Sequence, residues 1–180
     1  MLQITLPAVE MWDEENEMFV IAQKELTLQL EHSLVSISKW ESKWCKSFFS
    51  KQEKTVEEIM DYIQCMTVTQ NVNPETYNRL TKAHIQEIND YVAAPMTATT
   101  FGKEPGGNSR ELVTTELIYY WMISLGIPLE CQKWHLNRLI TLIRVCNIKN
   151  QPAKKMSKKD IISRNAQLNA MRRQQLGTKG

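Results

Sequence analysis

The chain has 180 residues, of which 42% are hydrophobic and 23% charged, with six glycines and six prolines. This length and balance fit one well-buried domain with tails, and they exclude wholesale disorder and a long low-complexity linker. The net charge of +2 is unevenly spread, because residues 149–180 hold nine Lys and Arg residues against one Asp. An acidic body therefore carries a basic C-terminal segment.

The first thirty residues show the alternation of apolar and polar side chains that is typical of strands. Leu2, Ile4 and Leu6 follow it, and an acidic turn comes after them at residues 13–16. The alternation returns at Leu26, Leu28 and Leu30. We predict an antiparallel hairpin or a three-stranded meander over residues 1–31. Two strands alone are marginal in water, so their apolar face is expected to pack on the helices that follow.

From Ser33 onward the spacing of apolar residues changes to three and four, as on one face of a helix. The first predicted helical face holds Leu34, Ile37, Trp40, Trp44 and Phe48. Thr55 is placed to cap a second helix. The apolar stripe of this second helix is Val56, Ile59, Ile63 and Met66. Both segments are predicted to be amphipathic helices.

Two further helix signals follow. Asn73 and Pro74 mark a helix start, because proline at the first helical position gives up an N–H that has no partner there. The pattern over residues 81–94 predicts another helix that ends before Pro95. A loop rich in glycine and proline then covers residues 94–110.

A helical hairpin is predicted beyond this loop. Ser109 is expected to cap a helix that reaches Leu125 and is apolar nearly all round, which is typical of a fully packed helix. Gly126 and Pro128 stop it, and a second helix runs from near Pro128 to about Ile148. One face of this second helix holds Leu136, Leu139, Ile140, Ile143 and Cys146 or Asn147. The charge-free interval of the hairpin, residues 117–129, is shorter than the roughly 20 residues of a membrane span.

These elements predict an α+β protein with a single domain over residues 1–150. The hairpin of residues 1–31 packs on a helical bundle of residues 33–148. Beyond the break at Pro152, Ser157 is placed to cap a helix that reaches about Arg173. Residues 151–180 are thus a basic helix or tail. An isolated helix of this length is marginal in water, so it is expected to dock or to need a partner.

Catalytic and metal-binding chemistry has few candidates. Cys131 and His135 are four residues apart, a spacing that suits zinc or a Cys–His pair, but no paired motif supplies the remaining ligands. The glycines near Lys103 lack the order of a phosphate-binding loop. Four widely spaced cysteines and no signal peptide predict free thiols in a reducing cytoplasm. We predict no enzymatic activity, no metal and no cofactor, and a protein that works by binding.

Two sets of residues are predicted to bind partners. Tryptophans at helical spacing are more often core or interface residues, and the aromatic set is the candidate for an apolar groove that would take an amphipathic helix. Its members are Trp40, Trp44, Phe48 and Phe49. A basic set is expected to meet an acidic partner or the chain's own acidic body, and nucleic acid is less favoured because no aromatic residue accompanies it. Its members are Lys154, Lys155, Lys158, Lys159, Arg172 and Arg173.

Four segments carry a resemblance to a known family. They read "LQLEHSLVSISKWESKW", "DYIQCMTVTQNVNPETY", "TTELIYYWMISLGIPLECQKWHLNRLITLIRVCNIKN" and "KKMSKKDIISRN". From about Leu28 to Lys179 the chain resembles small tailed-bacteriophage proteins of the tail morphogenesis region, which are described as tail assembly chaperones. The resemblance implies a mostly helical, self-associating protein of the host bacterial cytoplasm that holds the tape-measure protein soluble. It implies no enzyme, and the short charge-free interval of residues 117–129 predicts no membrane partner.

Two alternatives stay open. In the first, the chain is a structural tail or neck protein of the virion, and its N-terminal strands pair edge to edge with neighbouring subunits. In the second, it is a small nucleic-acid-binding or host-interfering phage protein that uses the basic C-terminus. The first alternative places the protein in the mature particle, whereas the chaperone is expected to be absent from it.

Overall fold

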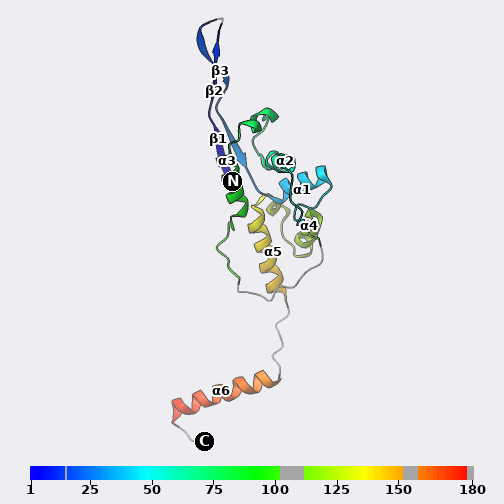
Figure 1. The fold of residues 1–180 in the computed structure, drawn as a ribbon. Coiled ribbons are helices and arrows are strands. Elements are labelled where there is room, and N and C mark those ends of the chain that lie inside the picture. Colours follow the sequence, from blue (N-terminus) through cyan, green and yellow to red (C-terminus); the bar gives the residue numbers. More distant parts are fainter. Residues whose placement is uncertain (15, 102–111, 152–157, 178–180) are drawn as a thin grey trace. The chain divides into compact units, whose positions relative to one another are not determined.

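A computed structural model describes residues 1–14, 16–101, 112–151 and 158–177 of the chain. The chain divides into two compact units, Met1–Asn147 and Ile148–Gly180 (Figure 1). The fold is α+β, as predicted, with strands at the N-terminus followed by helices. The α-helices are α1 (Leu34–Trp44), α2 (Val56–Met66), α3 (Lys82–Ala93), α4 (Thr115–Ser124), α5 (Leu136–Asn150) and α6 (Lys158–Leu176). Two 3₁₀ helices are η1 (Pro74–Arg79) and η2 (Leu129–Lys133).

The four strands form one long hairpin made of two antiparallel ladders. β1 (Leu2–Leu6) pairs with β4 (Leu26–Leu30), so that Ile4 lies opposite Leu28. β2 (Val9–Asp13) pairs with β3 (Met18–Gln23), with a bulge next to Val9. The predicted hairpin is confirmed, and the alternative of a three-stranded meander is wrong because, among the described residues, each of the four strands pairs with one other strand.

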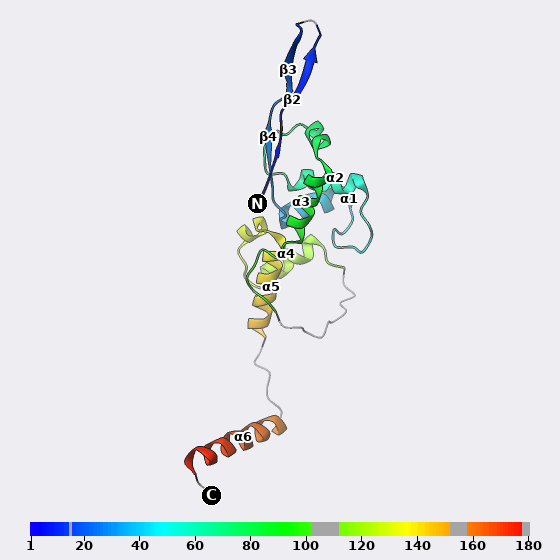
Figure 2. The ribbon, with the colours of Figure 1, turned by 60° about the vertical axis from the view of Figure 1, so that its left-hand side comes forward.

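The two ladders differ in burial. The alternating leucines and isoleucine of β1 and β4 face the helices and are buried, as the sequence pattern predicts: Ile4, Leu6, Leu28 and Leu30. The side chains of β2 and β3 are almost all exposed. Figures 1 and 2 show that β2 and β3 extend beyond the helices of the first unit. The hairpin is therefore anchored at β1 and β4 and projects at β2 and β3.

Side-chain caps fix where the first helices begin. Ser33 and Ser36 form a capping box at α1, and Thr55 and Glu58 form one at α2. α1 ends at Trp44, because Cys45 adopts a left-handed conformation with φ of 51°. Phe48 therefore lies beyond the helix rather than on its face. The predicted cap at Thr55 is confirmed.

The buried face of α2 differs from the predicted stripe. Val56 and Ile59 are exposed, whereas Tyr62, Ile63 and Met66 are buried. Glu58 and Asp61 are buried too, and they pair with Lys46 and Lys43. The carboxylates turn toward the basic residues at the end of α1, so the face that meets α1 is partly polar.

The predicted start at Asn73 and Pro74 is confirmed, but the element is the 3₁₀ helix η1 rather than an α-helix. α3 begins at Lys82 and ends before Pro95, as predicted. The break predicted at Pro152 and the cap predicted at Ser157 lie outside the described residues. α6 itself is described, and its side chains from Ile161 onward are exposed.

The helical hairpin of the sequence prediction needs two corrections. Ser109 lies outside the described residues, and α4 begins at Thr115. α4 is not packed all round, because Ile118 and Met122 are buried while Tyr120 and Ile123 are 64% and 70% exposed. α4 thus has more apolar residues than the neighbouring elements bury.

The second helix begins at Leu136 rather than near Pro128. Between α4 and α5 the chain forms η2 and then an isolated antiparallel bridge between His135 and Ser33. The backbone N–H of Leu136 donates to the carbonyl of His32 at 2.7 Å. This pairing keeps His135 extended, so α5 starts only after it. Leu136, Leu139 and Ile143 are buried as predicted, but Ile140 and Cys146 are only half-buried and Asn147 is exposed.

None of the helices in the described ranges has the length and apolarity needed to cross a membrane.

Candidate partner-binding surface

The β2–β3 hairpin carries an exposed apolar surface on both of its faces. Directly opposed residues share a face, and side chains alternate along each strand. Trp12 pairs with Phe19, and Ile21 lies on the same face, which we call the aromatic face. These three side chains are 52%, 66% and 62% exposed. Met11, Met18 and Val20 lie on the opposite face and are exposed as well.

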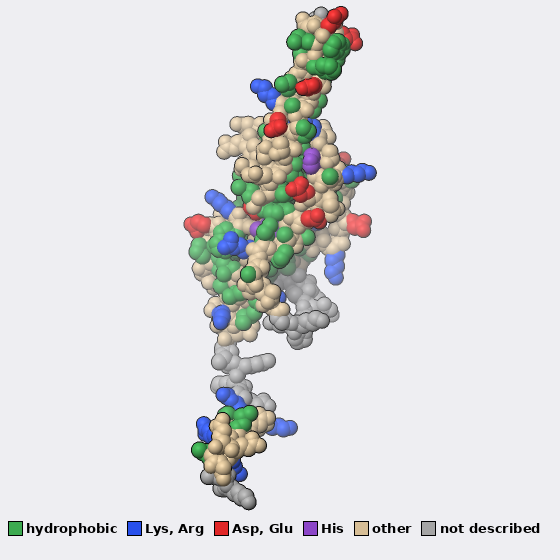
Figure 3. Space-filling view, turned by 90° about the vertical axis from the view of Figure 1, so that its left-hand side faces the viewer, with side chains coloured by type: hydrophobic (Ala, Val, Ile, Leu, Met, Phe, Trp, Pro, Cys, Tyr) green, Lys and Arg blue, Asp and Glu red, His purple; other side chains and the backbone are tan. Residues whose placement is uncertain are grey.

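The aromatic face is ordered by contacts within the hairpin. The rings of Trp12 and Phe19 are 5.1 Å apart between centroids and meet edge to face, a favoured geometry for aromatic pairs. Figure 3 shows hydrophobic side chains gathered on the hairpin beside acidic ones at its tip. A contiguous apolar surface on an otherwise ordinary protein is typical of a protein–protein contact.

The hairpin is also strongly acidic. Residues 9–23 hold five Asp and Glu residues and no Lys or Arg. At the turn, the amide of Asn16 donates to the Asp13 carboxylate at 2.8 Å, and Glu17 adopts a left-handed conformation with φ of 50°. Glu10, Glu14 and Glu17 are exposed. The surface therefore combines aromatic side chains with negative charge.

The predicted aromatic set lies elsewhere and is mainly internal. Trp40 is 1% exposed, and its indole N–H donates to the carbonyl of Glu58 at 2.9 Å. The ring of Phe48 is 5.3 Å from that of Trp40 and 4.3 Å from that of Tyr62. Trp40 is therefore closed to a partner, because it fills the space between α1 and α2.

The other members of this set are half-buried around the same cluster. The indole N–H of Trp44 donates to Asp61 at 2.9 Å, and Phe49 packs on Phe48. The ammonium of Lys54 lies 4.3 Å from the centre of the Phe48 ring. The four residues come together as predicted, but they form a packed cluster closed by Lys54 and not an open apolar groove.

The structure describes only part of the predicted basic set. Lys154 and Lys155 lie outside the described residues. Lys158 is the first residue of α6, and Lys159, Arg172 and Arg173 are exposed on that helix. α6 also exposes Ile161, Leu168 and Met171, which are spaced so that they fall on one side of the helix.

The Cys131 and His135 pair does not form a metal site. Cys131 is buried in η2, and the Nε2–H of His135 donates to the carbonyl of Tyr91 at 3.1 Å. The Nδ1 of His135 accepts from the backbone N–H of Asn137. Within the described ranges no group of three or more His, Cys, Asp and Glu side chains is placed to hold a metal ion. His135 is instead a packing residue whose two ring nitrogens are both used.

His135 belongs to a buried polar cluster that joins the strands to the helices. The rings of His32 and His135 are 5.0 Å apart, and Nδ1 of His32 lies 2.5 Å from the hydroxyl of Tyr62. Burial raises the pKa of the Tyr62 hydroxyl, which therefore stays protonated and donates to His32. Burial, followed by the positive charge that His135 can carry, lowers the pKa of His32 to about 4.

This cluster predicts a loss of stability below neutral pH. A histidine in the unfolded chain takes up a proton near pH 6.5, whereas folded His32 does so only near pH 4. The free energy of unfolding should thus fall by about 2 kcal/mol between pH 7 and pH 5 from His32 alone. Urea unfolding at the two pH values measures this difference.

His32→Gln tests the assignment, because glutamine cannot titrate and can still accept from Tyr62. It should flatten the pH dependence. His84→Gln is the matched control, since glutamine preserves the capping box that His84 forms with Thr81 at α3. Equal pH slopes for the two variants would contradict the role of His32.

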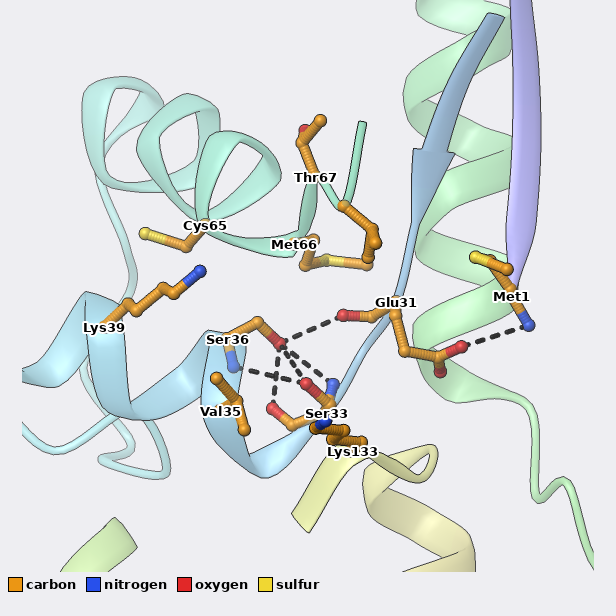
Figure 4. Close-up of a pocket in the computed structure, with 11 residues that line it drawn as sticks. Met1, Glu31, Ser33, Val35, Ser36, Lys39, Cys65, Met66, Thr67 and Lys133 are labelled. Atoms are coloured by element: carbon orange, nitrogen blue, oxygen red, sulfur yellow. Dashed lines mark hydrogen bonds and ion pairs between the residues drawn. The ribbon is translucent and has the colours of Figure 1, made fainter. Parts of the chain in front are cut away.

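A cleft of about 480 Å³ lies beside this cluster, between β4, α1 and the end of α2 (Figure 4). Lys39 and Lys133 line it, and its hydroxyl and carboxylate groups are engaged in contacts within the chain. The hydroxyls of Ser33 and Ser36 serve the cap of α1, and the Glu31 carboxylate accepts from the Met1 amine at 3.2 Å and from the Tyr91 hydroxyl at 2.7 Å. Burial and the neighbouring Asp61 carboxylate raise the pKa of the Cys65 thiol, which keeps it protonated. The cleft is a structural junction.

No protein family model, no curated protein and no solved structure matches this chain. Its function is therefore inferred from its own sequence and geometry.

Proposed function

We propose that the chain is a bacteriophage tail assembly chaperone that binds the tape-measure protein during tail morphogenesis, and that the aromatic face of the β2–β3 hairpin holds this client. The observation that carries the proposal is the exposure of Trp12, Phe19 and Ile21 on a ribbon whose backbone is anchored in the core through β1 and β4. The sequence resemblance to tail-morphogenesis proteins supplies the class of client.

The chemistry of the surface suits such a client. A long helical protein awaiting assembly exposes apolar stripes that would otherwise associate with each other. Aromatic side chains offer large contact areas with few rotatable bonds, so little conformational entropy is lost when they bind. The acidic residues around them disfavour association between hairpins, because like charges repel. The same residues favour client segments that carry Lys or Arg.

Co-expression with the tape-measure protein tests the proposal. The wild-type chain should raise the fraction of soluble client and should co-purify with it. Phe19→Ser with Ile21→Ser should reduce both to the level seen without the chain, while leaving the fold intact because these side chains are exposed.

The matched control is Tyr120→Ser with Ile123→Ser, which removes two similarly exposed apolar side chains from α4. It should retain the client as the wild type does. A client that is equally soluble with and without the chain would overturn the proposal. A client that is lost equally in both double variants would move the binding surface away from the hairpin.

A structural role in the virion has one observation in its favour. Each strand of the β2–β3 ribbon has a single partner within the described chain, so its outer edge can pair with a neighbouring subunit. Mass spectrometry of purified particles separates the two functions. The structural role requires stoichiometric copies in the particle, and the chaperone role requires that the protein be absent.

A further inference from the structure

We propose that, in the absence of client, the β2–β3 hairpin of one copy binds the basic helix α6 of a second copy. This inference rests on the proposed function only in treating the hairpin as a binding surface. In this arrangement α6 of a second copy occupies the surface that the client would bind, and each copy associates with another through two different surfaces.

Charge complementarity is the first support. Residues 9–23 hold five acidic residues and no basic one, whereas α6 holds five Lys and Arg residues and one Asp. Glu10, Glu14 and Glu17 are exposed on the hairpin, and Lys159, Arg172 and Arg173 are exposed on the helix. Opposite potentials on two surfaces steer them together and disfavour pairs of like surfaces.

The apolar content of the two elements is the second support. Trp12, Phe19 and Ile21 lie exposed on one face of the hairpin, and Leu168 and Met171 are exposed on α6. A helix of this length without tertiary packing is marginal in water, because its stability comes mainly from burial of one face. Docking on the aromatic face would supply that burial while the charges at the margins remain in water.

We assign the helix to a second copy, because every copy carries both an acidic hairpin and a basic helix, so that two copies offer each other complementary surfaces. Docking of α6 on the hairpin of its own chain would instead leave a monomer at low salt, which the sedimentation experiment below distinguishes.

One contact between the hairpin of one copy and α6 of another leaves a free helix on the first copy and a free hairpin on the second. These two can pair reciprocally in a two-fold dimer or bind further copies in rings or open chains. The purified protein without client should therefore form dimers or larger species, and salt should dissociate them. Between about 0.1 M and about 1 M NaCl the Debye length falls from about 10 Å to about 3 Å, which screens exposed charge pairs.

Sedimentation velocity of the full chain without client, at both salt concentrations, tests the inference with three variants. The hairpin variant is Glu10→Lys with Glu14→Lys. The helix variant is Arg172→Glu with Arg173→Glu. The control, Glu53→Lys with Glu87→Lys, makes the same change in net charge as the hairpin variant at exposed positions of the first unit. The wild type and the control should sediment as dimers or larger species at low salt, and the hairpin and helix variants should each sediment as monomers.

Mixing the hairpin variant with the helix variant gives the decisive measurement. The first retains a native α6 and the second a native hairpin, so one contact can form between them, and the mixture should sediment as a dimer and no further. A mixture that stays monomeric would overturn the inference. So would a wild type that is monomeric at low salt, or a wild type whose large species contain nucleic acid and vanish after nuclease treatment.

These outcomes are separate from those of the client experiment. Retention of client by a chain that does not self-associate would leave the chaperone function standing and remove only the role of α6. Self-association without any effect on client solubility would leave the role of α6 standing and remove the chaperone function.

Discussion

Trp40→Ala is expected to lower the free energy of unfolding by about 3–5 kcal/mol, the range found when a large buried aromatic side chain is truncated. The residue is 1% exposed, and its ring contacts those of Trp44 and Phe48. Truncation leaves a cavity between α1 and α2, and it also removes the donor to the carbonyl of Glu58. Urea unfolding followed by far-UV circular dichroism measures the loss.

Trp12→Ala is the matched substitution on the surface. Trp12 is half-exposed, and its main contact is the edge-to-face pair with Phe19. A cross-strand pair contributes up to about 1 kcal/mol, so this variant should be far less destabilised than Trp40→Ala. At a temperature where both variants are folded, Trp12→Ala should reduce client retention more than Trp40→Ala does. Similar losses of stability would show that Trp40 is not a core residue.

Glu41→Ala is expected to be destabilising by about 3–5 kcal/mol, although it removes a charged residue from a helix. The carboxylate of Glu41 is buried. It accepts from the backbone N–H of Phe48 at 2.7 Å and from the N–H and hydroxyl of Thr115 at 2.8 and 2.6 Å. These bonds hold the loop after α1 and the first turn of α4, where the helix dipole favours a negative charge.

Glu41→Gln distinguishes charge from shape. Both carboxylate oxygens accept hydrogen bonds, and an amide would turn one of these acceptors into a donor that faces another N–H group. The glutamine variant should therefore remain clearly destabilised. Glu53→Ala, at an exposed position outside any helix, should change the free energy of unfolding by no more than about 0.5 kcal/mol. Equal unfolding midpoints for Glu41→Ala and Glu53→Ala would contradict this account.

The local signals of the sequence predicted most of the fold. Alternation placed β1 and β4, and caps placed α2 at Thr55 and η1 at Asn73, because both depend on residues within one turn or one strand. The predictions failed where a distant contact decides the outcome. The start of α5 depends on the bridge between His135 and Ser33, and the buried face of α2 depends on Lys43 in α1 and on Lys46 just after it. Neither contact can be predicted from the spacing of the residues around it in the sequence.

The candidate surface was only partly predictable for the same reason. Residues 18–22 lie inside the hairpin or meander predicted over residues 1–31 and form a short run rich in β-formers, but burial and exposure cannot be told apart in such a run. The aromatic spacing at Trp40 and Trp44 favoured packing, and the groove was only a candidate. Glu41 carried no signal, because a lone glutamate in a helix is usually solvated.

The bridge between Ser33 and His135 has a consequence for the nascent chain. It joins the end of the first strands to the start of α5, near the two ends of the first unit's sequence. Leu139 and Ile143, which complete the core, come later still. During translation this contact can therefore form only after most of the first unit has left the ribosome, and contacts of such long sequence separation slow folding.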